Sequence, residues 1–342
     1  MSWQPFVTVG IPCLDEEDFI EDVVERVLGQ DYPADKMEVL VADGGSTDRT
    51  LEILAELERR DSRVRCIPNP GKIQAAGMNE IIRRAKGEVL IRLDAHADYA
   101  DDYISSCIRV LERTDADNVG GAARSLANNW FQKALCAALD SPLGVGGSKY
   151  RDANNEGFVE SVFNGAFRRR VFETAGMYDP GAITNEDAEL NQRILESGGK
   201  IFLSRDIVAY YYPRDSYSGL ARQYFKYGKG RARTLLKHGG LPSVRPLVPF
   251  IFTLGGLGLI ATRKRQPFTL PAFALYALGT GLEAVRVGRK VGLWGVPVVW
   301  SIFPVLHVSH GLGMAAGLWH YGRHPDWDEP ERVAEREAIE AE

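Results

Sequence analysis

Two side chains that can bind a metal follow directly after an apolar segment. Asp94 and His96 come after residues 88–93, whose composition is typical of a buried strand. Because alternate residues of a strand share a face, both side chains are expected to lie together at its C-terminal end. In an α/β sheet this end commonly binds the ligand, so the pair could hold a divalent cation and, through it, a phosphate. An isolated Asp-x-His is more often a solvated aspartate at a strand end than a metal site, so the metal interpretation depends on other segments of the chain.

Two further predicted strands end in residues suited to a nucleotide. These strands cover residues 6–11 and 38–42. The residues that follow them and could contact a nucleotide are Asp15, Glu16, Asp43 and Gly44. A glycine lets the backbone turn tightly and approach a ligand, which leaves Asp43 able to accept hydrogen bonds from a base or ribose. The segment 43–48 is also compatible with a turn in which a hydroxyl side chain caps the next helix.

The elements that would position these residues alternate between strands and helices. Apolar spacing and turn residues predict strand 6–11, helix 16–29, strand 38–42, a helix after residue 48, strand 64–67, helix 73–85 and strand 88–93. Such alternation predicts an α/β fold with a mixed, mainly parallel sheet that is flanked by helices. Ligands of such a sheet bind beyond the carboxyl ends of its strands, which is where the acidic residues fall.

Composition and charge exclude several classes of protein. The chain has 342 residues, enough for more than one structural unit, and a net charge of −5, which argues against a nucleic-acid partner. The four cysteines lack the spacing of a metal site or a disulfide framework, so they are interpreted as buried thiols in a reducing compartment. The first residues contain no charged and apolar regions typical of a signal peptide, and none is expected.

The composition changes near residue 243. Three later stretches contain no Asp, Glu, Lys or Arg: 246–262, 266–282 and 291–322. The first two are at the short end of what spans a bilayer and the third is long enough, so the sequence predicts C-terminal hydrophobic membrane helices. A helix pair buried in a water-soluble protein is the alternative. The domain prediction is 1–242 for a catalytic domain, 243–322 for a membrane-associated helical region and 323–342 for an acidic tail.

The topology of these helices stays open. If 246–262 spans the bilayer, the basic cluster 263–265 would face away from the cytoplasm, against the usual distribution of positive charge. The short stretches could instead be re-entrant or lie in the interface, because prolines such as Pro249 and Pro271 interrupt regular helices.

Taken together, the motifs resemble those of one enzyme family. The segments that carry the resemblance are 8–12 (Thr-Val-Gly-Ile-Pro), 15–16 (Asp-Glu), 43–48 (Asp-Gly-Gly-Ser-Thr-Asp) and 93–96 (Leu-Asp-Ala-His). The chain resembles family 2 glycosyltransferases with the GT-A fold, and most of all their succinoglycan-biosynthesis glucosyltransferase branch. The resemblance implies a nucleotide-sugar-binding, Rossmann-like catalytic domain over roughly residues 6–235.

The resemblance also implies roles for the strand-end residues. Asp15 and Asp43, with Glu16 and Gly44 beside them, would bind the uridine of a UDP-sugar, and Asp94 with His96 would occupy the family's metal-binding D-x-D position. His96 replaces the usual second aspartate, and since imidazole suits Mn²⁺ better than Mg²⁺, manganese is the expected metal. Asp98, two residues on, is a further carboxylate near the metal site.

The family's acidic pair falls on Glu186 and Asp187. The resemblance implies that Asp187 is the catalytic base, which removes a proton from the acceptor hydroxyl during inverting transfer. The local sequence is equally compatible with the acidic start of a helix capped by Asn185. Residues 222–231 depart from the Q-x-x-R-W motif of processive members, which favours addition of a single sugar.

The expected function is therefore transfer of a hexose, with glucose as the first choice, from a UDP-sugar to a lipid-linked (polyprenyl-diphosphate) saccharide in bacterial exopolysaccharide or cell-surface glycan biosynthesis. The expected location is the inner membrane with the catalytic domain facing the cytoplasm, alongside partners of a polysaccharide-assembly complex. Two alternatives are a nucleotidyltransferase, which would need a Gly-rich loop with a cation that segment 9–12 lacks, and a non-catalytic membrane scaffold that retains a sugar-nucleotide fold.

Overall fold

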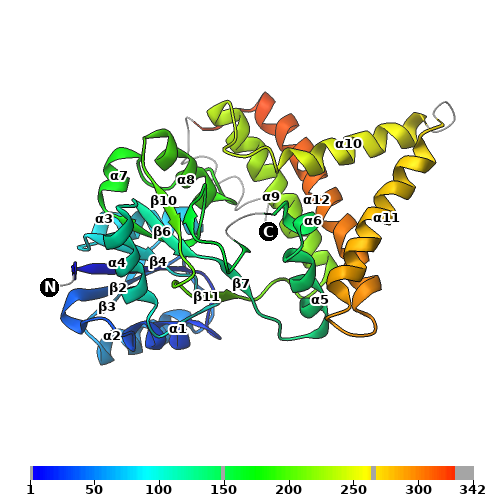
Figure 1. Cartoon of the computed structure of the whole chain (residues 1–342). Coiled ribbons are helices and arrows are strands. Elements are labelled where there is room, and N and C mark those ends of the chain that lie inside the picture. Colours follow the sequence, from blue (N-terminus) through cyan, green and yellow to red (C-terminus); the bar gives the residue numbers. More distant parts are fainter. Residues whose placement is uncertain (1–2, 148–150, 263–266, 328–342) are drawn as a thin grey trace. The chain divides into compact units, whose positions relative to one another are not determined.

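The computed structural model describes residues 3–147, 151–262 and 267–327. It divides into two compact units (Figure 1). The first contains the chain up to Arg124 and Asp152–Tyr211, and the second contains Ser125–Arg151 and Tyr212–Pro325. The domain boundary expected at residue 242 stays a prediction, and residues 328–342 of the expected acidic tail lie outside the described part of the chain.

Among the described residues, eight strands of the first unit form one mixed sheet in the order β3-β2-β1-β4-β9-β6-β10-β8. The strands are β1 (Val7–Cys13), β2 (Met37–Asp43), β3 (Val64–Pro68), β4 (Val89–Arg92), β6 (Asn118–Gly121), β8 (Gly157–Phe158), β9 (Phe163–Arg168) and β10 (Ile201–Leu203). The pairs from β3 to β4 and the pair β6–β10 are parallel, whereas β9 runs antiparallel to both of its neighbours. The predicted strands 6–11, 38–42, 64–67 and 88–93 correspond to β1 to β4.

Helices cover both faces of this sheet. They are α1 (Ile20–Leu28), α2 (Thr50–Arg60), α3 (Gln74–Arg84), α4 (Tyr103–Thr114), α7 (Arg170–Thr174) and α8 (Glu186–Glu196), with a 3-10 turn at Ala34–Lys36. In β2, Val39 and Val41 belong to a buried apolar cluster that also contains residues of α1, α2 and α4, while Leu40 and Ala42 belong to a second cluster that contains residues of α3, α7 and α8. Because successive strand residues point to opposite faces, a continuous apolar run is what a strand covered on both faces requires.

A second, smaller sheet begins immediately after the candidate metal-binding turn. Its order is β5 (Ala97–Tyr99), β11 (Ala209–Tyr211) and β7 (Ala123–Ser125). The antiparallel pairing of β5 with β11 sets Asp98 opposite Tyr210. Residues 94–96 are thus a short link between strands of two different sheets, which the sequence did not indicate.

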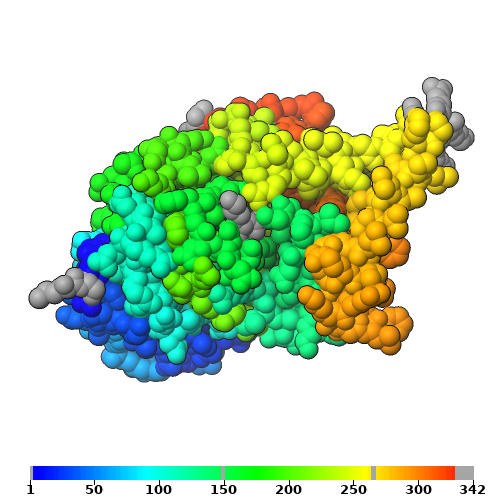
Figure 2. Space-filling model, in the orientation of Figure 1, coloured from blue at the N-terminus to red at the C-terminus, as the bar shows by residue number. Residues whose placement is uncertain are grey.

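The second unit is helical in its described residues. Its helices are α5 (Trp130–Leu139), α6 (Pro142–Val145), α9 (Tyr217–His238), α10 (Leu247–Thr262), α11 (Thr269–Gly288) and α12 (Gly295–Arg323). Many large apolar side chains of α10 and α11, which are yellow to orange in Figure 2, are exposed: Ile251 is 65% exposed and Leu275 is 71% exposed. Exposed apolar helices of this extent mark a surface that interacts with a membrane or another protein.

The sequence left the number of membrane-spanning helices open, and the helix lengths bear on that number. Among the described residues, α12 alone is long and apolar enough to cross a bilayer, with 29 residues and a mean hydropathy of 1.3 in an 18-residue window. The described part of α10 has 16 residues, and at 1.5 Å per residue this length is shorter than a typical hydrocarbon core. The helix α11 includes the charged residues Glu283 and Arg286, which form an ion pair at its C-terminal end.

Close packing of α9 against α12 depends on glycine. A Cβ atom built on Gly228 would collide with the main-chain oxygen of His310. We expect Gly228→Leu to push the two helices apart and to lower the free energy of unfolding by about 3 kcal/mol. Thermal unfolding in detergent should show this loss, whereas Gly255→Ala, where α10 has open space around the added atom, should leave the unfolding temperature unchanged or raise it slightly.

Candidate active site

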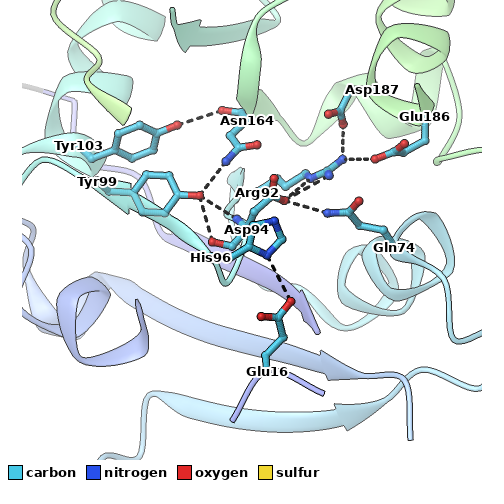
Figure 3. Close-up of polar contacts among 10 residues, drawn as sticks. All are labelled: Glu16, Gln74, Arg92, Asp94, His96, Tyr99, Tyr103, Asn164, Glu186 and Asp187. Carbon is cyan, nitrogen blue, oxygen red and sulfur yellow. Dashed lines mark hydrogen bonds and ion pairs between the residues drawn. The ribbon is translucent and has the colours of Figure 1, made fainter. Parts of the chain in front are cut away.

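Arg92, the last residue of β4, is a buried cation that contacts three carboxylates (Figure 3). Its Nη2 atom lies 3.2 Å from Oδ1 of Asp94, and its Nη1 atom lies 3.0 Å from Oε1 of Glu186. The same Nη1 atom also contacts the carboxylate of Asp187. Arg92 is 2% exposed, and a charge so deeply buried is tolerated only with partners, so the four groups stabilise one another.

The acidic pair lies in the first turn of α8. Asn185 is the N-cap residue of this helix, as predicted, but it has a φ of 62° and its side chain makes no capping hydrogen bond. Carboxylates at a helix N-terminus are favoured by the helix dipole. The Asp187 side chain is 31% exposed, but burial of its carboxylate raises its pKa to about 7. The negative charges of Glu186 and Asp94 also raise this pKa, whereas the positive charge of Arg92 lowers it.

Asp94 is fixed from several directions. Its Oδ1 atom accepts hydrogen bonds from Arg92 and from Nε2 of Gln74, at 2.9 Å, where α3 begins. Its main-chain N–H donates to the hydroxyl of Tyr99 at 2.8 Å, and Asn164 Nδ2 donates to the same hydroxyl at 2.7 Å. The turn after β4 is therefore held by side chains from three other elements before any ligand binds.

His96 lies at the exposed end of this turn. Its Nδ1 atom is 3.3 Å from Oε1 of Glu16, and 60% of the imidazole surface is exposed. Within residues 3–147, 151–262 and 267–327, no three or more His, Cys, Asp or Glu side chains form a preformed metal site. A carboxylate, an imidazole and a nearby second carboxylate fit a cation whose remaining positions are filled by phosphate oxygens and water. Asp98 lies 3.5 Å from Arg26, and its part in metal binding stays a prediction.

The carboxylates after β1 and β2 hold two neighbouring loops together. Cys13 and Asp43 are paired in the sheet register, so both strands end at the same level. Asp43 is 5% exposed and accepts a hydrogen bond of 2.8 Å from the N–H of Gly45 in its own turn. Asp15 accepts one of 2.7 Å from the N–H of Thr47. The helix α2 begins at Thr50 and its N-cap is Arg49, so no hydroxyl of the turn caps it.

Next to Asp43, the backbone leaves little room for side chains. A Cβ atom on Gly44 would lie 3.2 Å from the main-chain oxygen of Lys72. Gly45 has a φ of 88°, which favours glycine. The assignment of Asp15, Asp43, Glu16 and Gly44 to a nucleotide stays a prediction, but the structure places them at adjacent strand ends as expected.

Arg92 is the functional candidate that the sequence reasoning missed. A signal existed, because a single arginine interrupts the apolar run of residues 88–93 just before Asp94. A cation inside a central strand needs buried anionic partners, and this requirement could have linked Asp94 to the acidic pair at residues 186–187. Gln74, Tyr99 and Asn164 carried no comparable signal, because their contacts depend on tertiary structure.

Comparison with known proteins identifies the family. Residues 8–176 match the family described as Glycosyl transferase family 2. The chain is 39% identical over 315 residues to the succinoglycan biosynthesis protein ExoA of Rhizobium meliloti (strain 1021). The aligned residues make up 91% of this chain and 93% of that protein. The chain belongs to glycosyltransferase family 2. This family 2 glycosyltransferase is accordingly an enzyme of sugar transfer, which removes the nucleotidyltransferase and scaffold alternatives.

A second relative and a solved structure agree with this assignment. The glycosyltransferase is 29% identical over 318 residues to the dolichyl N-acetyl-alpha-D-glucosaminyl phosphate 3-beta-D-2,3-diacetamido-2,3-dideoxy-beta-D-glucuronosyltransferase of Methanococcus voltae, covering 90% of this chain and 96% of that one. It superimposes on a mannosyltransferase of Pyrobaculum calidifontis in complex with GDP-Man and Mn²⁺ with a TM-score of 0.65, 19% identity and coverage of 93% and 88% of the two chains. The structural likeness shows that the fold is GT-A, as predicted.

Proposed function

We propose that this glycosyltransferase transfers a hexose, with glucose as the first choice, from a UDP-sugar to a lipid-linked saccharide with inversion at the anomeric carbon. The observation that carries the proposal is the shared Arg92 cluster, in which a carboxylate at a helix N-terminus and the first residue of the Asp-x-His turn contact one cation. The name of the Rhizobium meliloti relative supports a role in bacterial exopolysaccharide or cell-surface glycan synthesis.

On the donor side, Asp15, Asp43, Glu16 and Gly44 would hold the uridine, and Asp94 with His96 would hold a divalent cation. When bound, the cation supplies positive charge to the departing diphosphate. The imidazole favours Mn²⁺ over Mg²⁺, and the similar mannosyltransferase structure contains Mn²⁺ with its nucleotide sugar. Glu16 lies beside His96 and would keep the imidazole oriented.

On the acceptor side, Asp187 would act as the base. Its carboxylate takes the proton of the acceptor hydroxyl while the hydroxyl oxygen forms a bond to the anomeric carbon from the face opposite the nucleotide. The bond between that carbon and the phosphate oxygen breaks, and UDP leaves with the electron pair. The partial exposure of Asp187 gives an acceptor access to it.

The acceptor is proposed to be a polyprenyl-diphosphate saccharide, because its apolar tail stays in the bilayer and the second unit has exposed apolar helices. The name of the Methanococcus voltae relative describes a dolichyl-linked sugar phosphate. The proposed location is the inner membrane with the first unit in the cytoplasm, anchored through α12 or through α10 and α11 in the interface. Association with other proteins of polysaccharide assembly is part of the same proposal.

A release assay on the full chain in detergent tests the reaction. UDP-glucose, other UDP-sugars and GDP-mannose would each be offered with a polyprenyl-diphosphate saccharide, in Mn²⁺ or in EDTA, and nucleotide release and glycolipid product would be measured. We expect acceptor-dependent release from one UDP-sugar, abolished by EDTA and restored by Mn²⁺. Release from GDP-mannose alone would contradict the uridine assignment, and full activity in EDTA would contradict the metal assignment.

The pH dependence of the reaction follows from the raised pKa of Asp187. As a base, Asp187 must be ionised, and its pKa is raised to about 7 by burial. We therefore expect kcat/KM, which reports the free enzyme, to fall as the pH decreases through about 7 and to be level above it. A profile that is flat down to pH 5 or below would assign the proton transfer to a group with an ordinary carboxyl pKa.

A further inference from the structure

The guanidinium of Arg92 connects the donor side of the candidate site with the acceptor side. We propose that Arg92 is a positioning residue that holds the base Asp187 in a fixed relation to the donor-side carboxylate Asp94. The inference rests on the proposed function, from which it takes the roles of these two carboxylates.

The geometry of the cluster gives each edge of the guanidinium a separate partner (Figure 3). Nε and Nη2 each lie 3.2 Å from Oδ1 of Asp94, on one edge of the planar group. Nη1 faces α8, where it meets Glu186 at 3.0 Å and also contacts Asp187. Because the guanidinium is rigid and planar, the position of one carboxylate restricts the position of the other.

Arg92 itself has little freedom to move. It ends a strand whose four residues are all buried, and the ring of Tyr178 lies over it, with 5.9 Å between the ring centroid and Cζ. Asn79 fixes Tyr178 by a pair of hydrogen bonds, one of 2.9 Å from the Tyr178 N–H and one of 2.8 Å to its carbonyl. A lysine would keep the charge at this place but not the planar set of donors.

The charges of the cluster are unequal. One cation faces the three carboxylates of Asp94, Glu186 and Asp187, so two negative charges are in excess when all are ionised. This excess equals the charge of one divalent cation, which the donor would bring to Asp94. Arg92 therefore reduces the repulsion among the carboxylates before the donor binds, and it keeps Asp187 in place.

Two variants of Arg92 and one control test the proposal. Arg92→Lys keeps the charge, and Arg92→Gln removes it. Arg168→Gln is the control, because Arg168 is a half-buried arginine at the end of β9 that donates to the main-chain oxygens of Leu111 and Ala116, at 2.7 and 3.0 Å, and to no carboxylate in these bonds. For each full-length variant we would measure the unfolding temperature, the affinity for Mn²⁺ without donor, kcat, and the pH profile of kcat/KM.

The charged and titratable groups that face Asp187 are Arg92, Glu186, Asp94 and Tyr178. Arg92→Gln leaves only negative or neutral neighbours, so the acid limb of kcat/KM should move to higher pH by about one unit or more. It should lower kcat by about 10²-fold, because the base is no longer held. Mn²⁺ alone should bind at least as tightly as in wild type, since Asp94 loses a competing positive charge. Arg92→Lys keeps the positive charge, so the acid limb of its kcat/KM profile should lie at the wild-type pH, but its kcat should be only partly restored.

Other results would overturn the proposal. One such result is that Arg92→Gln lowers the unfolding temperature and kcat to the same extent as Arg168→Gln, while the acid limb of kcat/KM is unchanged and Mn²⁺ binds more weakly. Arg92 would then only stabilise the fold. If Arg92→Gln does not fold, Arg92→Lys provides the test. A wild-type kcat in that variant would contradict the proposal that Arg92 positions Asp187. A wild-type protein that transfers no sugar from any donor would instead contradict the proposed function, while Mn²⁺ binding would still report whether Arg92 acts on Asp94.

Discussion

Asp187→Asn is expected to lower kcat by about 10³-fold or more while the affinity for the UDP-sugar stays within about threefold of wild type. Asparagine keeps the size of the side chain and can still meet Arg92, but it cannot accept the acceptor's proton. The affinity is retained because the donor contacts are assigned to the strand ends of β1, β2 and β4. Initial rates at saturating donor and acceptor, together with calorimetric titration of UDP-sugar, would measure both quantities.

A matched control lies on the same helix. Glu196 is exposed at the other end of α8 and accepts a hydrogen bond from Gln192, so Glu196→Gln should keep the wild-type kcat. If Asp187→Asn turned over normally, the base would have to be another group, and Glu186, which contacts Arg92 beside it, would be tested next. Loss of donor binding in Asp187→Asn would point to a role on the donor side.

The second large effect is expected on the donor side. Asp94→Asn should weaken binding of the UDP-sugar with Mn²⁺ by about 10²-fold, because one negatively charged ligand of the cation is lost. It should also lower kcat, since Arg92 loses the negative charge of its partner on that side. Titration of UDP-sugar with and without Mn²⁺ would separate the two effects, and the metal-dependent part of the affinity should disappear.

Asp98→Asn serves as the control for this experiment. Asp98 is two residues after His96 and lies 3.5 Å from Arg26 on α1. We expect its loss to change the Mn²⁺-dependent affinity by less than about threefold. A loss as large as that of Asp94→Asn would make Asp98 a ligand of the cation and would revise the proposed metal site.

The strands and helices around the site could be predicted because local sequence determines them. The run 88–93 and the strands before it are rich in Val, Ile and Leu, and such runs are buried on both faces of a central sheet. The positions of Asp15, Asp43 and Asp94 at strand ends followed from the same reading. The order of the remaining strands did not, because β9 pairs with β4 on one side and with β6 on the other, over long sequence separations.

The contacts inside the site were less predictable. That Asp15 accepts a hydrogen bond from Thr47, and that Arg92 meets residues 186–187, depends on how loops distant in sequence come together. The number of membrane spans could not be predicted, because a stretch without charges does not define the bounds of a helix. In the described part of the chain α10 covers Leu247–Thr262, and α11 continues to Gly288, past its charged residues.

The turn that carries Asp94 and His96 has an energetic consequence. It is fastened at one end to β4 in the eight-stranded sheet and at the other to β5, which pairs with β11 in a different sheet. A loop anchored twice and bonded through Tyr99 and Asn164 is already ordered before the nucleotide arrives. Donor binding at this turn should therefore cost little conformational entropy, and calorimetry would register the association as favoured by enthalpy with only a small entropic loss from the protein.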